Sequence, residues 1–336
     1  MSTVAVVILN YNGKGFLSQF LPGVITHSTG CEIIIADNCS TDDSINFIQN
    51  FYPEIQLIQI PNNKGFSAGY NYALAQINAQ YYVLLNSDVE VTPNWISPII
   101  DIMEKDISIA AAQPKILAHH NRNQFEYAGA GGGYIDYLGY PFCRGRIFDT
   151  LEDDYGQYDD MKQVFWASGA CLFIRSAIYH ELGGLDDDFF AHMEEIDLCW
   201  RINNAGHKVM YNGQSAVYHV GGGTLPKSSP RKTYLNFRNG LSLLFKNYDT
   251  VDLLAKLPVR ILLDIVAAFN FSLGGSIKNG WAVVKALFHF LGKTPSNWQK
   301  RKKVQQLRKK NVPTKLYQKS IVYRHFILNK KTFNEL

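Results

Sequence analysis

Apolar runs and amphipathic segments alternate over the first 120 residues of the chain. Continuous runs rich in β-branched residues, typical of strands buried on both faces, occupy residues 4–9, 33–36, 55–60, 82–85 and 109–112. Segments with a helical pattern lie between these runs. This alternation of strands with helices predicts an α/β fold, in which a mostly parallel central sheet is flanked by helices.

Capping residues locate the helices between these strands. One helix is expected to begin near Thr41 or Asp42, and a second to span roughly residues 67–77. A third is expected to begin at Thr92, which would cap it, with Pro93 at the first helical position. Its apolar residues, which we expect to face the core, are Ile96, Ile99, Ile100 and Met103.

The next part of the chain has a weaker pattern. Residues 129–160 are rich in Gly, Tyr and Asp without a clear period, and we interpret them as a long loop region of the kind that often carries function. VFWASGACLFIR (residues 164–175) predicts a strand, a turn and a strand. EEIDLCWRINNAG (residues 194–206) predicts a helix that stops at Gly206, and a strand pattern follows it.

The C-terminal third combines apolar helical segments with basic residues. Residues 253–273 and 277–291 are apolar but interrupted, so neither provides the roughly 20 clean apolar residues of a membrane span. The basic run WQKRKKVQQLRKK (residues 298–310) follows them. This pattern favours a segment that lies in a membrane interface. The alternative is a helical hairpin packed on the main domain with a solvated basic tail.

Composition and charge narrow the class of protein. Of the 336 residues, 46% are hydrophobic and 18% charged, which is typical of a folded chain rather than a disordered one. Residues 251–336 contain 17 Lys and Arg against three acids, whereas the preceding part is acidic, so the C-terminal third is expected to meet an anionic partner. Five scattered cysteines and a strand pattern at the N-terminus lead us to expect a cytoplasmic protein with reduced thiols.

Polar residues with possible chemistry follow three predicted strands, where ligands bind in open α/β sheets. Asp37 could accept hydrogen bonds from a base or a ribose, or could simply cap a helix. Gly65, in NNKGFSAGYN (residues 62–71), permits close backbone approach to an anion, or merely forms a strand–helix turn. Asp88, in NSDVEV, stands one step beyond a buried strand, where a carboxylate suits Mg²⁺ or Mn²⁺ beside a diphosphate.

An acidic cluster opens the helix predicted at residue 194. Glu194, Glu195 and Asp197 exceed what a helix N-terminus needs, and packed carboxylates raise the proton affinity of one member, which suits a general base. Asp197 could instead orient Arg201, four residues later. His219, in VYHVGGG, ends a strand beside glycines that leave room for a ligand, although a lone His is more often structural.

The order of these motifs resembles glycosyltransferase family 2, particularly its rhamnosyltransferase-like members. The matching stretches are VVILNYNG, IIIADNCSTDDS, NNKGFSAGYNYA, YYVLLNSDVEV, the segment from FWASGACLFIR to RINNAG, YHVGGG and YLNFRN. The resemblance implies a GT-A fold over residues 1–248, with a nucleotide-binding half (1–120) and an acceptor half (121–248). Residues 249–336 would form a helical, basic, membrane-interfacial extension.

The resemblance also implies roles for particular residues. The metal-binding D-x-D position reads Asn86-Ser87-Asp88, and the Glu-Asp position of the catalytic base reads Glu194-Glu195. The implied catalytic residues are Glu195, Glu194 and Asp197. The residues implied to bind the nucleotide-sugar are Asn10, Asp37, Asn38, Asn63, Gly65, Asn71 and Asn86. The metal ligands would be Asp88 and His219, and Trp166 would stack on the acceptor sugar unless it is a core aromatic.

The resulting hypothesis is an inverting transferase that uses Mg²⁺ or Mn²⁺. The donor would be a dTDP- or UDP-linked hexose, with dTDP-rhamnose first, and the acceptor a hydroxyl of a glycan or a lipid-linked sugar in surface polysaccharide synthesis. We expect peripheral contact with the inner face of the cell membrane through the C-terminal region, and no nucleic-acid partner.

Two other classes of protein are an oxidoreductase and a non-catalytic binding module. GAGGGY (residues 129–134) lacks the final glycine of a dinucleotide fingerprint and no glycine turn follows the first strand, which argues against an oxidoreductase. A non-catalytic module that binds a nucleotide-sugar or a glycan would keep Asp37 but would not need the acidic cluster.

Overall fold

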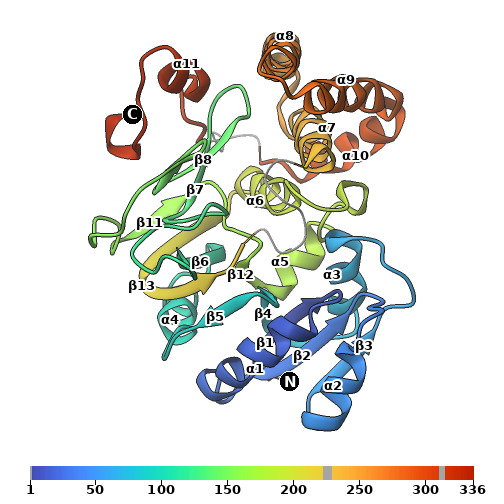
Figure 1. Cartoon of the computed structure of the whole chain (residues 1–336), viewed down its shortest axis with the longest axis vertical. Coiled ribbons are helices and arrows are strands. Elements are labelled where there is room, and N and C mark those ends of the chain that lie inside the picture. The colour runs from blue at the N-terminus through green and yellow to red at the C-terminus, as the bar shows by residue number, and fades with distance from the viewer. Residues whose placement is uncertain (1, 222–228, 310–314) are drawn as a thin grey trace.

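The computed structural model describes residues 2–221, 229–309 and 315–336 (Figure 1). Within these residues, nine strands form one central sheet in the order β11-β13-β6-β12-β4-β1-β2-β3, with β5 paired to β13. The strands are β1 (Ser2–Asn10), β2 (Glu32–Asp37), β3 (Gln56–Gln59), β4 (Ala79–Asn86), β5 (Val89–Val91), β6 (Ile109–Ala118), β11 (Met161–Val164), β12 (Cys171–Arg175) and β13 (Lys208–His219).

Most of these strands are parallel. β1 runs parallel to β2 and β4, β2 runs parallel to β3, and β6 runs parallel to β13. The exceptions are β12, which lies antiparallel between β4 and β6, and β5 and β11, which pair antiparallel with β13. The mostly parallel sheet predicted from the sequence is therefore confirmed.

Helices cover both faces of the sheet (Figure 1). They are α1 (Lys14–His27), α2 (Ser44–Phe51), α3 (Phe66–Leu74), α4 (Ser97–Lys105), α5 (Ser176–Glu181), the 3₁₀ turn η1 (Asp187–Phe189) and α6 (Glu194–Asn204). Side chains alternate along β1: Val6 packs in a core with α1 and α4, while Val7 packs in a core with α3 and α6. The side chains of β1 therefore enter an apolar core on both faces of the sheet, which explains why this strand is a continuous β-branched run.

Two local predictions are wrong. The helix α4 begins at Ser97 rather than Thr92, because the Thr92 hydroxyl donates to the carbonyl oxygen of Ala216 (2.7 Å) and Asn94 has a positive φ of 59°. The segment 129–160 is not simply a loop, since it contains a four-stranded antiparallel sheet. Its strands are β7 (Gly133–Ile135), β8 (Pro141–Cys143), β9 (Arg146–Ile147) and β10 (Thr150–Leu151).

The C-terminal part is helical, as predicted, and packs against the rest of the chain. It contains α8 (Thr250–Leu273), α9 (Ile277–Gly292) and α10 (Thr294–Leu307), which form one bundle with α7 (Pro230–Asn247). The helix α11 (Ile321–Phe326) lies apart from this bundle, where Ile321 packs with Phe142 and Ile147 of the small sheet, and the 3₁₀ turn η2 (Phe333–Glu335) follows it. Buried Arg260 of α8 donates to the carbonyl oxygens of Leu138 and Gly139 (3.2 and 3.0 Å). Buried Arg301 donates to Phe245, so the basic run is not wholly solvated.

No helix of the described residues has the combination of length and apolarity that a membrane-spanning segment needs. However, α8 and α9 leave a large apolar face uncovered. Its most exposed residues include Leu254, Leu262, Phe269, Leu273, Ile277, Trp281 and Phe288. The extension therefore packs on the main domain, as the second interpretation predicted, and still presents an apolar surface.

Candidate active site

Polar residues gather where parallel strands end. Asn10, Asp37 and Asn86 are the last residues of β1, β2 and β4. The strand register pairs Asn10 with Asp37 and sets Asn86 opposite Leu9. The structure therefore brings these three predicted residues to one edge of the sheet, where ligands bind in open α/β folds.

Asn10 and Asp37 form a buried polar pair. The Asn10 amide nitrogen donates to Asp37 Oδ2 (2.9 Å), and the backbone N–H of Ser40 donates to Asp37 Oδ1 (2.8 Å). The side-chain oxygens of Asn10 and Asn38 are buried and have no hydrogen-bond partner within the described part of the chain. Because buried acceptors are normally paired, these two oxygens are suited to N–H or O–H groups of a ligand.

The loop before α3 is tied to this pair. The Asn38 amide donates to Asn63 Oδ1 and to the Gly65 carbonyl oxygen (both 3.1 Å), and Asn63 Oδ1 also accepts the Gly65 N–H (2.9 Å). Gly65 has a φ of 91°, and a Cβ there would lie 2.5 Å from the carbonyl oxygen of Phe190. Only glycine fits this position, where the loop meets the segment that precedes α6.

Asp88 and His219 are in direct contact. His219 Nε2 lies 3.1 Å from Asp88 Oδ1, and His219 Nδ1 lies 3.3 Å from a carboxylate oxygen of Glu126. Burial alone would lower the pKa of His219, but hydrogen bonds and charges from both carboxylates raise it to about 10. Burial alone would raise the pKa of Asp88, but His219 holds it below its ordinary value. Sequence reasoning missed Glu126, which lies in an irregular segment without a motif.

Asp88, His219 and Glu126 do not form a complete metal site by themselves. Among the residues that the structure describes, no three or more His, Cys, Asp or Glu side chains are arranged to hold a metal ion. Asp88 and His219 alone offer one carboxylate oxygen and one imidazole nitrogen at the mouth of the sheet. A divalent cation would have to replace the proton on His219 Nε2, and its remaining ligands would come from phosphates and water, as is usual for Mg²⁺.

Glu194 is buried and Glu195 is half-buried at the start of α6. Burial raises the pKa of Glu195 to about 7, while burial and then the charge of Glu195 raise the pKa of Glu194 well above its ordinary value. One carboxylate oxygen of each residue is buried without a hydrogen-bond partner in the described residues. The environment therefore disfavours the charged form of Glu194, and Glu195 is poised to exchange a proton near neutral pH.

One turn connects the two parts of the site. The backbone N–H of Asn86 donates to the Ala170 carbonyl oxygen (3.0 Å), and Asn86 lies two residues before Asp88. A Cβ at Gly169 would lie 3.7 Å from Cβ of Glu195 and 3.4 Å from the ring of Phe66. The turn formed by residues 168–170 is thus bordered by the Asp88 segment on one side and by Glu195 on the other.

Two predicted binding residues have structural contacts instead. The Asn71 amide donates to the carbonyl oxygen of Leu185 (2.8 Å), and its oxygen accepts the Tyr179 hydroxyl (2.5 Å), so it joins α3 to the segment after α5. The Trp166 ring is 3% exposed, donates to the Tyr134 carbonyl oxygen (2.8 Å) and packs on a glycine. Asn71 thus holds two elements together although it is half-buried, and Trp166 is a core aromatic that is closed to a sugar.

Asp197 also lies away from the reacting groups. Its carboxylate is completely buried, contacts Arg201 (3.0 Å) and Lys246 (3.0 Å), and accepts the Asn247 amide (2.7 Å). With these cations and the amide around it, Asp197 cannot reach a substrate, and its contacts support the alternative role of orienting Arg201. The catalytic role predicted for Asp197 is therefore replaced by a structural one.

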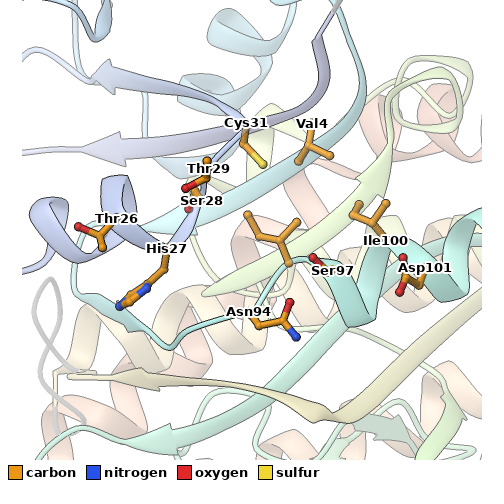
Figure 2. Close-up of a pocket in the computed structure, with 12 residues that line it drawn as sticks. Val4, Thr26, His27, Ser28, Thr29, Cys31, Asn94, Ser97, Ile100 and Asp101 are labelled. Carbon is orange, nitrogen blue, oxygen red and sulfur yellow. The ribbon is translucent and has the colours of Figure 1, made fainter.

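A surface pocket lies apart from this site. A cavity of about 450 Å³ lies between the turn after α1 and the start of α4 (Figure 2). Its lining includes Val4, near the beginning of β1, and Cys31, just before β2. It therefore opens at the amino ends of these strands, whereas Asn10 and Asp37 mark their carboxyl ends.

Comparisons with known proteins agree with the motif order. The family model described as "Glycosyl transferase family 2" matches residues 5–178. The chain is 25% identical over 231 residues to the N-acetylglucosaminyl-diphospho-decaprenol L-rhamnosyltransferase of Mycobacterium tuberculosis, covering 64% of this chain and 75% of that protein. It is 22% identical over 303 residues to the low-salt glycan biosynthesis hexosyltransferase Agl10 of Haloferax volcanii, covering 86% of each.

Solved structures share the fold. GalNAc-T7, determined with UDP, GalNAc and Mn²⁺, aligns with a TM-score of 0.57 at 17% identity, over 74% of this chain and 49% of that one. At this identity the likeness concerns the fold alone. Together with the family match, it confirms the GT-A architecture predicted from the sequence.

Proposed function

The chain belongs to glycosyltransferase family 2, and we propose that it is an inverting, metal-dependent hexosyltransferase. The donor is a nucleoside-diphosphate sugar, and the acceptor is a hydroxyl of a glycan or of a lipid-linked sugar. The observation that carries this proposal is the common turn at residues 168–170, which the Asp88 segment and Glu195 approach from two sides. This arrangement supports a diphosphate site and a proton acceptor on the two sides of one turn.

The nucleotide is held at the strand ends. Asn10, Asp37 and Asn38 surround the base and the ribose, for which the two unpaired amide oxygens are acceptors. Gly65 lets the backbone of its loop approach the donor, and Asn86 stands beside the diphosphate. The relative from M. tuberculosis, named as an L-rhamnosyltransferase, supports dTDP-rhamnose as the first candidate donor, with UDP-linked hexoses next.

Asp88 and His219 would hold the divalent cation. When bound, Mg²⁺ or Mn²⁺ compensates the negative charge that a diphosphate develops as it leaves. The Mn²⁺ in the GalNAc-T7 structure supports a cation of this kind. Glu126 fixes the His219 ring through its second nitrogen, as outer carboxylates do for metal-bound histidines.

Glu195 acts as the general base. Its carboxylate takes the proton of the acceptor hydroxyl while that oxygen attacks the anomeric carbon from the face opposite the diphosphate. A single displacement of this kind inverts the anomeric configuration. A pKa of about 7 keeps Glu195 partly ionised at neutral pH and strong enough to accept a proton.

The extension supports a lipid-linked acceptor at the inner face of the cell membrane. Figure 1 shows that α8 and α11 lie at the same end of the molecule, away from the N-terminal strands. Phe269 and Trp281 are 66% and 65% exposed on α8 and α9. Lys278 is exposed on α9, and Lys302 and Lys303 are exposed on α10. Apolar side chains with basic neighbours suit an anionic bilayer surface.

Vesicle sedimentation tests the membrane contact. Phe269→Glu is expected to reduce binding to vesicles with anionic lipid at least tenfold, because it puts a charge on the apolar face. Phe51→Glu is the matched control, since Phe51 is similarly exposed (70%) on α2, in the N-terminal half. Equal loss in both variants, or no loss in Phe269→Glu, would refute a membrane surface on α8.

Product analysis tests the transferase activity. Purified protein with dTDP- or UDP-sugars and Mn²⁺ is expected to release the nucleoside diphosphate and to form a product whose anomeric configuration, determined by NMR, is opposite to that of the donor. Retained configuration would contradict the single displacement. Donor binding without turnover for any acceptor sugar would instead identify a non-catalytic nucleotide-sugar module.

A further inference from the structure

The segment just before the acidic pair has an unusual backbone. Phe190, His192 and Met193 have φ values of 64°, 70° and 72°, in a region that non-glycine residues seldom adopt. Met193 is immediately followed by Glu194 and Glu195 at the start of α6. Backbone of this kind is strained in non-glycine residues and persists only where the surroundings impose it.

One side chain of α7 contacts the backbone of this segment at three points. The amide nitrogen of Asn239, which is completely buried, lies 3.0, 3.0 and 2.7 Å from the carbonyl oxygens of Phe189, Ala191 and His192. An amide nitrogen has two hydrogens, so at least one is shared between carbonyls. The Asn239 amide therefore fixes the direction of these carbonyl groups.

Arg238 fixes the Asn239 side chain in turn. Its Nε and Nη2 donate to Asn239 Oδ1 (2.9 and 2.7 Å), and Nη2 also donates to the carbonyl oxygen of Asp188 (2.7 Å). The oxygen and the nitrogen of the Asn239 amide are thus both engaged, and the side chain cannot flip without losing contacts on each side.

The same segment also reaches the donor side of the site. The Phe190 carbonyl oxygen accepts the backbone N–H of Phe66 (2.6 Å), and Gly65 leaves the space that this contact needs. Upstream, Asp186 and Asp188 are anchored by ion pairs to Lys246, Lys293 and Lys300. Those pairs hold residues 186–188, whereas Asn239 holds the backbone between them and α6.

We propose that Asn239, oriented by Arg238, is a positioning residue that holds residues 189–193 so that Glu195 faces the acceptor hydroxyl. This inference rests on the proposed role of Glu195. Asn239 touches neither reacting group and acts through the backbone that carries them. A misplacement of about 1 Å at a catalytic group can cost on the order of 10²-fold in rate, so loosening this segment affects turnover more than donor binding.

Steady-state kinetics with a matched control test the proposal. Asn239→Ala is expected to lower kcat about 10²-fold while the Kd for the nucleoside diphosphate changes less than about threefold. Asn279→Ala is the control, because Asn279 is also a buried asparagine of the helical bundle but contacts Ser276 and Thr233. Arg238→Lys, which keeps the charge but loses the paired contact, is the milder variant, and a smaller fall in kcat is expected.

Amide hydrogen exchange separates this proposal from the proposed function. In Asn239→Ala, the amides of residues 190–195 are expected to exchange at least tenfold faster than in the wild type or in Asn279→Ala. Unchanged exchange, or a kcat equal to that of the control, would overturn the positioning role. If the wild type transfers no sugar while exchange in this segment still rises in Asn239→Ala, the proposed transferase function fails. The role of Asn239 in holding residues 189–193 is then retained.

Discussion

Glu195→Gln separates the catalytic role of this residue from its effect on stability. The substitution preserves the size of the side chain but removes the proton acceptor. General-base action supplies roughly 10²–10⁴-fold in rate, so kcat is expected to fall by that factor while donor binding is kept. In the wild type, kcat is also expected to fall about tenfold per pH unit below about pH 7, because protonated Glu195 cannot accept a proton.

The same substitution is expected to stabilise the fold at high pH. Below about pH 4.5 the Glu195 carboxyl is protonated in both the folded and the unfolded chain, and the two proteins should differ little on this account. Between pH 4.5 and about 7, the unfolded chain releases the proton while the folded chain retains it, so wild-type stability falls relative to the variant. The gap between a pKa of 4.5 and one of about 7 corresponds to roughly 3 kcal/mol.

Urea unfolding at pH 5, 6, 7 and 8 measures this gap. The free energy of unfolding of Glu195→Gln, minus that of the wild type, is expected to increase with pH and to level off above about pH 7. A difference that is constant over this range would show that Glu195 is not held in an environment that disfavours its charge. Full activity of the variant would refute its role as the base.

Two further substitutions test the contacts around the site. Glu126→Gln is expected to weaken Mn²⁺ binding roughly 10–100-fold, because His219 loses the carboxylate that orients its ring; an unchanged Mn²⁺ titration followed by electron paramagnetic resonance would contradict this. Gly65→Ala is expected to destabilise the protein by more than Gly30→Ala does, and to weaken nucleotide binding. Both glycines have positive φ, but a Cβ at Gly65 meets Phe190 whereas the space at Gly30 is open, so equal unfolding energies would count against a tight contact between the two segments.

The sequence was most informative where a pattern is local. The continuous apolar runs predicted the core strands, and they also predicted that Asp37 and Asp88 lie at the carboxyl ends of two of them. The start of α4 was missed because a hydrogen bond from Thr92 to a strand more than 100 residues away competes with helix capping. Strands of two or three residues, such as β9 and β10, are too short to show a period of two.

The remaining parts of the site depend on distant contacts. Glu126 and His219 are 93 positions apart in sequence, and neither belongs to a shared motif that would predict their pairing. Asn239 acts on a backbone that lies 47 to 50 positions earlier. Asp197 was given a catalytic role because it lies close to Glu195 in sequence, but on the helix it turns toward Arg201 and Lys246 instead.

Calorimetric titration of UDP and dTDP tests the central claim most directly. The claim is that Asp88 holds the cation for the donor diphosphate while Glu195 serves only the acceptor. The wild type and Glu195→Gln are expected to bind one of the two nucleotides with Mn²⁺ and much more weakly with EDTA, and Asp88→Asn to bind weakly in both conditions. Binding by Asp88→Asn that equals the wild type and still depends on Mn²⁺ would contradict the account.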